Sequence, residues 1–244
     1  MTKQLIFIIF LNVIVSKQGK YNELSKTKFN SLKKKPHLQK APGLNTPTGK
    51  CRLAILASGS GSNAQRFIDY FREHPKIEIA VIISNNSGAY VLKRAEEAGI
   101  PTVVVPKSGW DDKGTIKALF LSHRVDAVVL AGYLLLLPSW FIAMFPGRIF
   151  NIHPALLPDF GGKGMYGIHV HRAVIDSGAR QSGITIHLVN EAYDEGEILF
   201  REKLNVLPED TPESLARRVL VLEHRYYPRV VADYLSGLRS LSFE

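Results

Sequence analysis

The sequence predicts an α/β fold in which helices cover both faces of a doubly wound, mostly parallel sheet, with extra strands at its C-terminal end. From Arg52 the chain alternates short apolar runs with longer amphipathic runs, which is typical of strands joined by helices. Runs such as 79–83 are continuously apolar, as expected for strands that are buried on both faces. After residue 178 apolar and polar residues alternate, which indicates strands of a different kind.

The elements follow one another in regular order. Short apolar runs predict strands at 52–57, 77–84, 102–105, 126–131 and 148–152. Amphipathic runs predict helices at 63–73, 89–98, 113–123, 139–145 and 167–177. Two further strands are expected at 183–189 and 197–206. Thr211 then caps a last helix whose first position is Pro212, an arrangement that suits both residue types.

The first fifty residues carry the whole charge excess of the chain. The formal net charge is +9, and residues 1–50 hold ten Lys, no Arg and one acid, Glu23. Residues 51–244 therefore have no net charge, and nothing in them suggests a surface that binds the phosphate backbone of nucleic acid. We expect a basic, disordered leader at 1–50 and one domain with a sizeable core at 51–244.

A targeting role for this leader is the alternative interpretation. The apolar stretch at 5–15 follows Lys3 and has the length of a signal-peptide core, too short to span a membrane. However, no small-x-small cleavage site follows Val15, and a transit peptide is expected to be rich in Arg. We therefore expect a cytoplasmic protein, with organelle targeting or export as the alternative. The single Cys51 excludes an internal disulfide and fits a reducing compartment.

The turn after the first predicted strand has the composition of a phosphate-binding loop. It reads SGSGSNA over residues 58–64. Its glycines allow the backbone to approach a ligand closely, and its amides lie at a helix N-terminus. The spacing also fits a dinucleotide pattern, but the second strand ends in Ser-Asn-Asn at 84–86 instead of an acid that would bind a ribose. NAD is therefore disfavoured, and a plain tight turn is the alternative.

The end of the fifth predicted strand carries an amide and an imidazole. Asn151 and His153 alternate with Ile152, so both point to one face at the strand's carboxyl end, where ligands bind in such sheets. Together with Asp194 they supply what acyl transfer to an amine needs: an oxyanion donor, a proton carrier and a group that sets its charge. For His153 alone, a hydrogen-bonded core histidine is the alternative.

The remaining histidines are less informative. His169 and His171 have the spacing of metal ligands, but no Cys or acid accompanies them and they are expected at the start of a helix. We therefore predict no metal site. His187 alternates with Thr185 on a predicted strand, and it could line the same site as His153.

Six motifs together resemble the phosphoribosylglycinamide formyltransferase family. They are SGSGSN at 58–63, LAGY at 130–133, NIHPALLP at 151–158, GITIH at 183–187, YDEG at 193–196 and EH at 223–224. The resemblance covers about 52 to 238, essentially the whole domain. It implies a Rossmann-like formyltransferase fold and transfer of a formyl group from 10-formyltetrahydrofolate to the amino group of 5-phosphoribosylglycinamide in purine biosynthesis.

The resemblance also implies roles for individual residues. Asn151, His153 and Asp194 match the family's catalytic residues. The residues that match its binding site for phosphoribosylglycinamide are Gly61, Ser62 and Asn63 for the phosphate and Glu223 for the ribose hydroxyls. The residues expected to bind the folate co-substrate are Lys113, Leu134, Leu135, Leu136, Leu137, Asn151, Asn190 and Asp194. We expect a monomer or homodimer that acts on these small molecules without a metal, nucleic acid or membrane.

Some positions depart from the family pattern. Leu135 stands where many members have Arg, which leaves open a charged contact to the folate or the formyl group. Lys113 aligns with another Arg that contacts ligand. The glycine-rich stretch 160–167 is longer than its counterpart in many members, and it could fold over the folate as a lid.

The expected chemistry is direct attack of the glycinamide nitrogen on the formyl carbon. Asn151 and a protonated His153 would hold the tetrahedral oxyanion. A free imidazole titrates near pH ~6.5, so the nearby carboxylate of Asp194 is expected to raise the pKa of His153 and keep it protonated.

Other proteins share parts of this pattern. Methionyl-tRNA formyltransferase would need a basic extension on the C-terminal side, whereas the basic segment here is N-terminal. Formyltetrahydrofolate hydrolase would carry an N-terminal regulatory domain with a globular pattern, which residues 1–50 lack. A non-catalytic nucleotide-binding module would keep the glycine turn without using the three catalytic residues.

Overall fold

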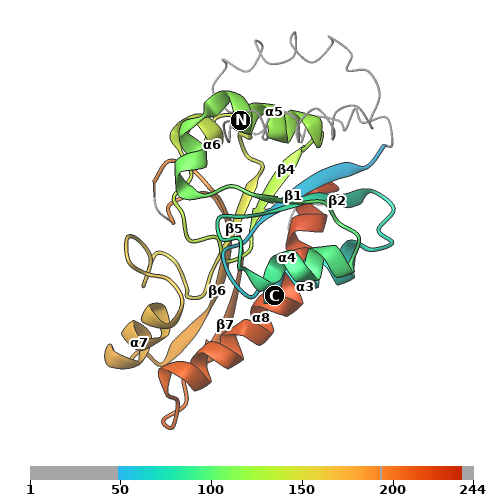
Figure 1. The fold of residues 1–244 in the computed structure, drawn as a ribbon. Helices are drawn as coiled ribbons and strands as arrows, with labels where there is room; N and C mark the ends of the chain where they lie inside the picture. The colour runs from blue at the N-terminus through green and yellow to red at the C-terminus, as the bar shows by residue number, and fades with distance from the viewer. Residues whose placement is uncertain (1–48, 193, 238–244) are drawn as a thin grey trace. The chain divides into compact units, whose positions relative to one another are not determined.

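A computed structural model describes residues 49–192 and 194–237, so nearly all of the expected leader lies outside the described residues. The described chain forms a seven-stranded sheet in the order β3-β2-β1-β4-β5-β6-β7 (Figure 1). Its strands are β1 (Cys51–Leu56), β2 (Ile77–Ser84), β3 (Thr102–Val104), β4 (Ala127–Leu130), β5 (Ile149–His153), β6 (Gln181–Leu188) and β7 (Ile198–Asn205).

Helices connect these strands in the predicted alternation. They are α3 (Ser62–Phe71), α4 (Tyr90–Glu97), α5 (Lys113–Ser122), α6 (Ser139–Ile142), α7 (Ile168–Asp176) and α8 (Pro212–Leu235), with a short 3-10 helix η1 (Lys107–Asp111). The sequence pattern does not predict η1, because so short a segment carries no usable period. None of the helices in the described part of the chain is long and apolar enough to cross a membrane.

The strand pairing in the sheet changes from parallel to antiparallel at β5. The pairs β2–β3, β1–β2, β1–β4 and β4–β5 are parallel, whereas β5–β6 and β6–β7 are antiparallel. The predicted mostly parallel sheet with extra C-terminal strands is therefore confirmed. The chain builds outward from β1 to β3 and then returns to the other side of β1 with β4. Loops diverge at the carboxyl ends of β1 and β4, which is where ligands bind in such sheets.

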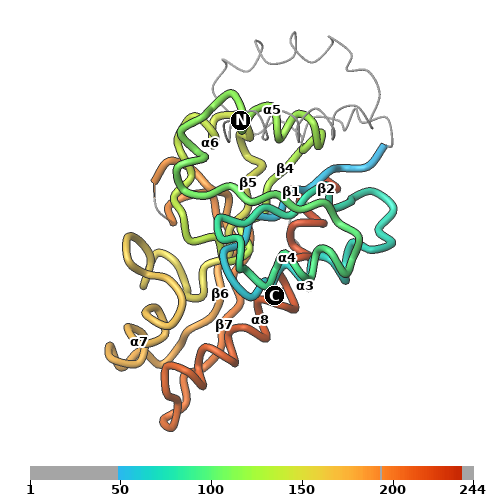
Figure 2. The backbone as a smooth tube through the Cα atoms, in the orientation of Figure 1, coloured from blue at the N-terminus to red at the C-terminus, as the bar shows by residue number. Residues whose placement is uncertain are grey.

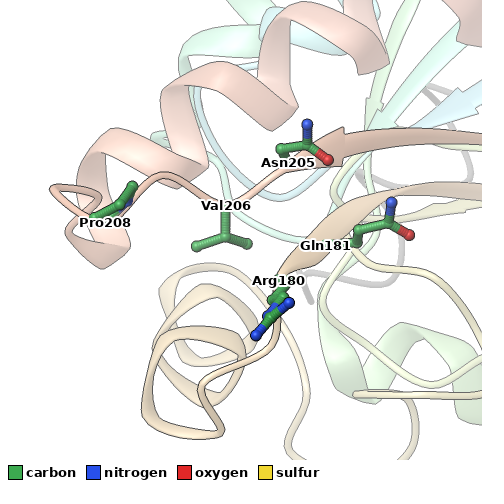
Figure 3. Close-up of a pocket in the computed structure, with 5 residues that line it drawn as sticks. All are labelled: Arg180, Gln181, Asn205, Val206 and Pro208. Atoms are coloured by element: carbon green, nitrogen blue, oxygen red, sulfur yellow. The ribbon is translucent and has the colours of Figure 1, made fainter.

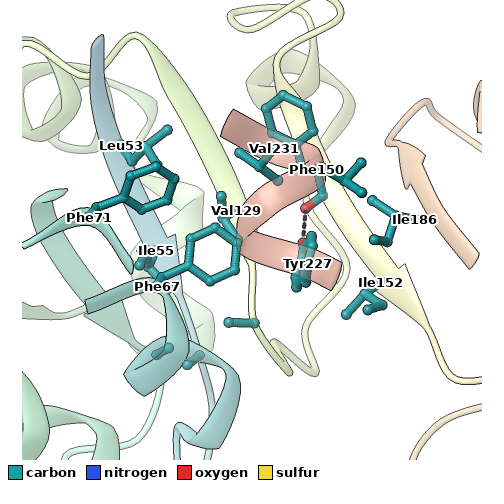
Figure 4. Close-up of a cluster of buried hydrophobic side chains, with 14 of the residues drawn as sticks. Leu53, Ile55, Phe67, Phe71, Val129, Phe150, Ile152, Ile186, Tyr227 and Val231 are labelled. Atoms are coloured by element: carbon teal, nitrogen blue, oxygen red, sulfur yellow. Dashed lines mark hydrogen bonds between the residues drawn. The ribbon is translucent and has the colours of Figure 1, made fainter. Parts of the chain in front are cut away.

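Helices cover both faces of the sheet (Figures 1 and 2). One buried cluster joins α3, α4 and α8 to the sheet, and the other joins η1, α5 and α6 to the opposite face. In the first cluster Phe67 of α3 meets Tyr227 of α8 edge to face, with ring centroids 4.9 Å apart (Figure 4). The alternate residues Leu53 and Ile55 of β1 support this cluster, whereas Ala54 belongs to the other, as strands buried on both faces require.

The last helix, α8, fixes the strands that carry the candidate site. It begins as predicted, because Thr211 accepts the N–H of Ser214, the Ser214 hydroxyl accepts the N–H of Thr211, and Pro212 holds the first position. Further along, the buried Tyr227 hydroxyl bonds the carbonyls of Leu130 at 3.1 Å and Phe150 at 2.9 Å. One helix thereby holds the carboxyl end of β4 and the first half of β5.

Candidate active site

Two neighbouring strands bring Asn151, His153 and His187 together. Asn151 and His153 lie two residues apart near the carboxyl end of β5, and Asn151 pairs with His187 on antiparallel β6. Directly opposed residues of such a pair share a face of the sheet. Asn151 Nδ2 lies 3.2 Å from His187 Nε2, and both imidazoles are buried.

Asp194 joins these side chains from a loop. Its Oδ2 lies 3.6 Å from His153 Nδ1, and its Oδ1 lies 3.6 Å from His187 Nε2. Asp194 has a φ of +54°, which is uncommon outside glycine and is held only where the surroundings fix it. The structure thus brings the three predicted catalytic residues together, and His187 lies beside them, as its position on the strand suggested. We call Asn151, His153, His187 and Asp194 the site cluster.

The carboxyl group of Asp194 is ionised in these surroundings. Burial on its own would raise the pKa of Asp194. The hydrogen bond to His187, the N–H of Gly162 and the charges of the two histidines outweigh burial and hold this pKa below its usual range. The Gly162 N–H donates to Oδ2 at 3.0 Å, so the glycine-rich stretch 160–167 lies against the site cluster.

The expectation that Asp194 raises the pKa of His153 is wrong in its net direction. Burial lowers this pKa below 6.5 and outweighs Asp194 and the Phe160 carbonyl, both of which raise it. The physical reason is that a carboxylate 3.6 Å away offsets only part of the desolvation of a buried imidazolium. His153 is therefore neutral at neutral pH in this structure.

A contact with the backbone determines which ring nitrogen of His153 carries the proton. Its Nε2 lies 2.8 Å from the Phe160 carbonyl, and a carbonyl can only accept, so the proton of the neutral imidazole is on Nε2. Nδ1 is then left to accept a proton on the side facing Asp194. No residue type marks the Phe160 carbonyl or the Gly162 N–H in the sequence, because both groups belong to the backbone.

The glycine turn is built as the sequence predicts. Gly61 is the N-cap of α3 and has a φ of +71°, and a Cβ there would lie 2.5 Å from Val91 Cγ2. Only glycine fits this position without strain. No side chain caps α3, and Gln65 N–H is bonded to the Gly61 carbonyl. The N–H groups of 62–64 have no partner within the helix, and the N-terminus of a helix is a favourable position for an anion.

Glu223 reaches this turn from α8. Asn63 Nδ2 donates to Glu223 Oε2 at 2.6 Å across 160 positions of sequence. Burial raises the pKa of Glu223 to about 7, although the Asn63 bond lowers it. The buried Oδ1 of Asn63 has no hydrogen-bond partner within residues 49–192 and 194–237. The residues expected to bind phosphate and ribose are thus in direct contact.

The loop after β4 presents apolar side chains. Leu134 is 64% exposed and Leu136 62% exposed, whereas Leu137 is buried. Leu135, at the position of the family's Arg, packs against the core cluster of η1, α5 and α6. The exposed leucines alternate with the two that pack inward.

The other residues expected at the folate lie on neighbouring loops. Lys113 is the exposed first residue of α5. Asn190 is exposed just beyond β6, where its side chain accepts the N–H of Ala192 at 3.1 Å. Within the described residues neither side chain bonds the site cluster, and the structure does not bring them to it.

The histidine pair on α7 has two different environments. His169 is exposed and its ring meets Tyr166 at 5.4 Å. His171 is buried, and burial together with the charge of His153 lowers its pKa to about 4. Within the described residues no group of three or more His, Cys, Asp or Glu side chains could hold a metal ion.

A surface hollow of about 800 Å³ lies at the other end of β6 and β7 (Figure 3). It is lined by Arg180, Gln181, Asn205, Val206 and Pro208. Along β6 its lining residues lie roughly 20 Å from His187, given the rise of a strand. This hollow is therefore separate from the site cluster.

Comparisons with known proteins point to one family. Residues 51–231 match the model of the formyl transferase family. The chloroplastic phosphoribosylglycinamide formyltransferase of Arabidopsis thaliana is 44% identical over 186 residues, which cover 74% of this chain and 64% of that protein. The chain thus spans less than two thirds of this relative. The Haemophilus influenzae phosphoribosylglycinamide formyltransferase is 35% identical over 191 residues, which cover 76% of this chain and 88% of that protein.

Solved structures agree with this similarity. The phosphoribosylglycinamide formyltransferase of Anaplasma phagocytophilum superposes with a TM-score of 0.70 and 36% identity, covering 77% of this chain and 88% of the other. The glycinamide ribonucleotide transformylase 1 of Symbiobacterium toebii gives a TM-score of 0.71 and 34% identity. The match covers 80% of this chain and 93% of that protein's chain. The described fold and the expected family resemblance therefore agree.

Proposed function

The chain belongs to the formyl transferase family, and we propose that it transfers the formyl group of 10-formyltetrahydrofolate to the amino group of 5-phosphoribosylglycinamide in purine biosynthesis. The observation that carries this proposal is the convergence of Asn151, His153 and Asp194 at the carboxyl end of the sheet. The names of the relatives, among them a protein of which this chain covers 88%, support the same reaction.

The ribonucleotide fits the glycine turn and α8. Its phosphate would bind the N–H groups at Gly61, Ser62 and Asn63, because a helix N-terminus with unpaired amides favours an anion. Its ribose hydroxyls would bind Glu223, which already contacts Asn63. The unpaired Oδ1 of Asn63 offers an acceptor to the same ligand.

The folate fits the loop after β4. Leu134 and Leu136 are largely exposed, and apolar side chains beside a few polar groups are typical of a site for a flat heterocycle. Backbone from Asn190 to Asp194 would bind the polar edge of the pteridine. Lys113 would add a cation, and Leu135 would contribute backbone only, because its side chain packs inward.

The ionised Asp194 and the neutral His153 suggest a route for the proton that the amine loses during formyl transfer. The amine nitrogen attacks the formyl carbon, and the carbonyl electron pair moves to oxygen, where an N–H of Asn151 donates to the oxyanion. Neutral His153 accepts the proton that the nitrogen loses. The imidazolium then returns this proton to the folate nitrogen as its bond to carbon breaks. An imidazolium formed 3.6 Å from an ionised Asp194 is stabilised by that charge.

A formyl-transfer assay with 5-phosphoribosylglycinamide tests this proposal. Wild-type protein should form formylated product, and Asn151→Ala or His153→Ala should lower kcat by at least about a hundredfold, the scale of losing one preorganised catalytic group. His169→Ala is the matched control, because this histidine is exposed on α7, and it should keep the wild-type rate. No transfer by a folded wild-type protein would refute the proposal, and near wild-type kcat in a site variant would remove that residue from the mechanism.

A further inference from the structure

Helix α4 supports the glycine turn from behind. The Val91 N–H donates to the Gly59 carbonyl at 3.2 Å. The Val91 side chain fills the space next to Gly61, where a Cβ would lie 2.5 Å from Val91 Cγ2. Arg94, one helical turn further along, donates from Nε to the Ser60 carbonyl at 2.8 Å. Each residue from Gly59 to Gly61 therefore meets a group of α4.

Arg94 is held in this place by more than one contact. Its Nη1 donates to Gln65 Oε1 in the first turn of α3 at 3.1 Å, and its guanidinium carbon lies 4.9 Å from the ring centroid of Tyr90. The guanidinium thus bridges the turn and the helix that follows it. A planar group fixed at several points loses little freedom on binding and can hold its partners in one geometry.

The bond to Ser60 determines where an amide points. The Ser60 carbonyl and the Gly61 N–H belong to one planar trans peptide, so they point in opposite directions. Because Arg94 holds this carbonyl, it also orients the Gly61 N–H away from α4. A charged donor on the carbonyl further polarises the peptide and strengthens its N–H as a donor.

We propose that Arg94 is a positioning residue for the substrate's phosphate group, acting through the Ser60–Gly61 peptide. The proposal rests on the proposed function for the identity of the substrate. It gives α4 a role in substrate binding, although Arg94 itself does not touch the reacting atoms.

The test compares Arg94→Met with Lys93→Met. Both changes remove a positive charge from α4. Lys93 is exposed, its Nζ lies 3.9 Å from Glu97 Oε1 and 5.7 Å from the Tyr90 ring centroid, and within the described residues it makes no hydrogen bond or ion pair with the turn. Arg94→Met should raise KM for 5-phosphoribosylglycinamide by roughly tenfold, the scale of one lost charge-assisted hydrogen bond. The kcat and the KM for the folate should change less than about twofold on the same scale. Arg94→Lys should recover part of the loss, since it keeps the charge.

A binding measurement separates this inference from the proposed function. Inorganic phosphate should raise the Tm of wild-type protein and of Lys93→Met, and it should raise the Tm of Arg94→Met much less. Equal phosphate protection and equal KM in the two Met variants would overturn the role of Arg94. If wild-type protein formed no product but phosphate protection still depended on Arg94, the proposed function would fail and the role of Arg94 would stand. If Arg94→Met does not fold, the same comparison is made with Arg94→Lys, and unchanged phosphate protection there overturns the role.

Discussion

At the scale of single residues, the chemistry of the site depends on the pKa of His153, which burial lowers and the carboxylate of Asp194 raises. Residue spacing placed His153 and Asp194 in one site, but spacing alone could not show which influence dominates. Burial of His153 depends on the whole environment of β5 and on the Phe160 carbonyl. For this reason the sequence predicted the residues and missed the direction of the pKa shift.

Replacing Asp194 with Asn tests the contribution of the carboxylate to the pKa of His153. Asp194 raises the pKa of His153 against burial, so the variant should lower that pKa further. Because neutral His153 accepts the proton in the proposed mechanism, the acidic limb of the kcat profile should move to lower pH. The maximal rate should fall by about a hundredfold, because the imidazolium loses its partner.

A pH–rate profile of Asp194→Asn beside wild type makes this measurement, with Glu191→Gln as a control at an exposed neighbouring acid. The control should follow the wild-type curve. A profile that is scaled down without any displacement of its acidic limb would count against the electrostatic role. Asp194 would then act by ordering the loop through the Gly162 N–H.

At the scale of elements, the loops after β1 and β4 are joined by Ser58. The Ser58 N–H donates to the Gly132 carbonyl at 3.1 Å, and the Ser58 hydroxyl accepts the N–H of Leu134 at 2.9 Å. The sequence predicted both loops as binding segments, but it gave no sign of their mutual contacts, one of which joins residues 76 positions apart. Such contacts leave no periodic pattern in the sequence, so they could not be predicted from it. The same holds for the hydrogen bond between Arg94 and Ser60.

Ser58→Ala should weaken binding at the loop after β4. The change removes the acceptor for the Leu134 N–H, worth about 1 kcal/mol, so KM for 10-formyltetrahydrofolate should rise roughly fivefold. KM for the ribonucleotide should change less, because the backbone bond to Gly132 remains. Steady-state kinetics with both substrates varied measures this, and Ser87→Ala at an exposed loop serves as the control. An unchanged folate KM in a folded Ser58→Ala protein would mean that the link does not position the loop.

At the scale of the whole molecule, the described sheet is organised as the apolar runs predict, with one helix holding its centre together. Each apolar run indicates a strand from local sequence, and the change of pattern after residue 178 indicates the two antiparallel strands. The contacts of Tyr227 could not be predicted in the same way, because its hydroxyl meets carbonyls 97 and 77 positions away. These contacts depend on the packed arrangement of α8 over β4 and β5.

Tyr227→Phe tests how much this helix contributes to stability. The hydroxyl is fully buried and bonds the carbonyls of Leu130 and Phe150. Figure 4 shows the bond to Phe150. Burial raises its pKa well above 10, so it remains a donor throughout the working range. Removing it leaves two buried carbonyls without this donor and should lower the free energy of unfolding by about 1–3 kcal/mol. Urea denaturation measures the change, and Tyr226→Phe at the neighbouring half-buried position is the matched control. Equal stability of the two variants would show that the hydroxyl of Tyr227 does not stabilise the packing of α8, which would then depend on other contacts such as the ring of Tyr227 against Phe67.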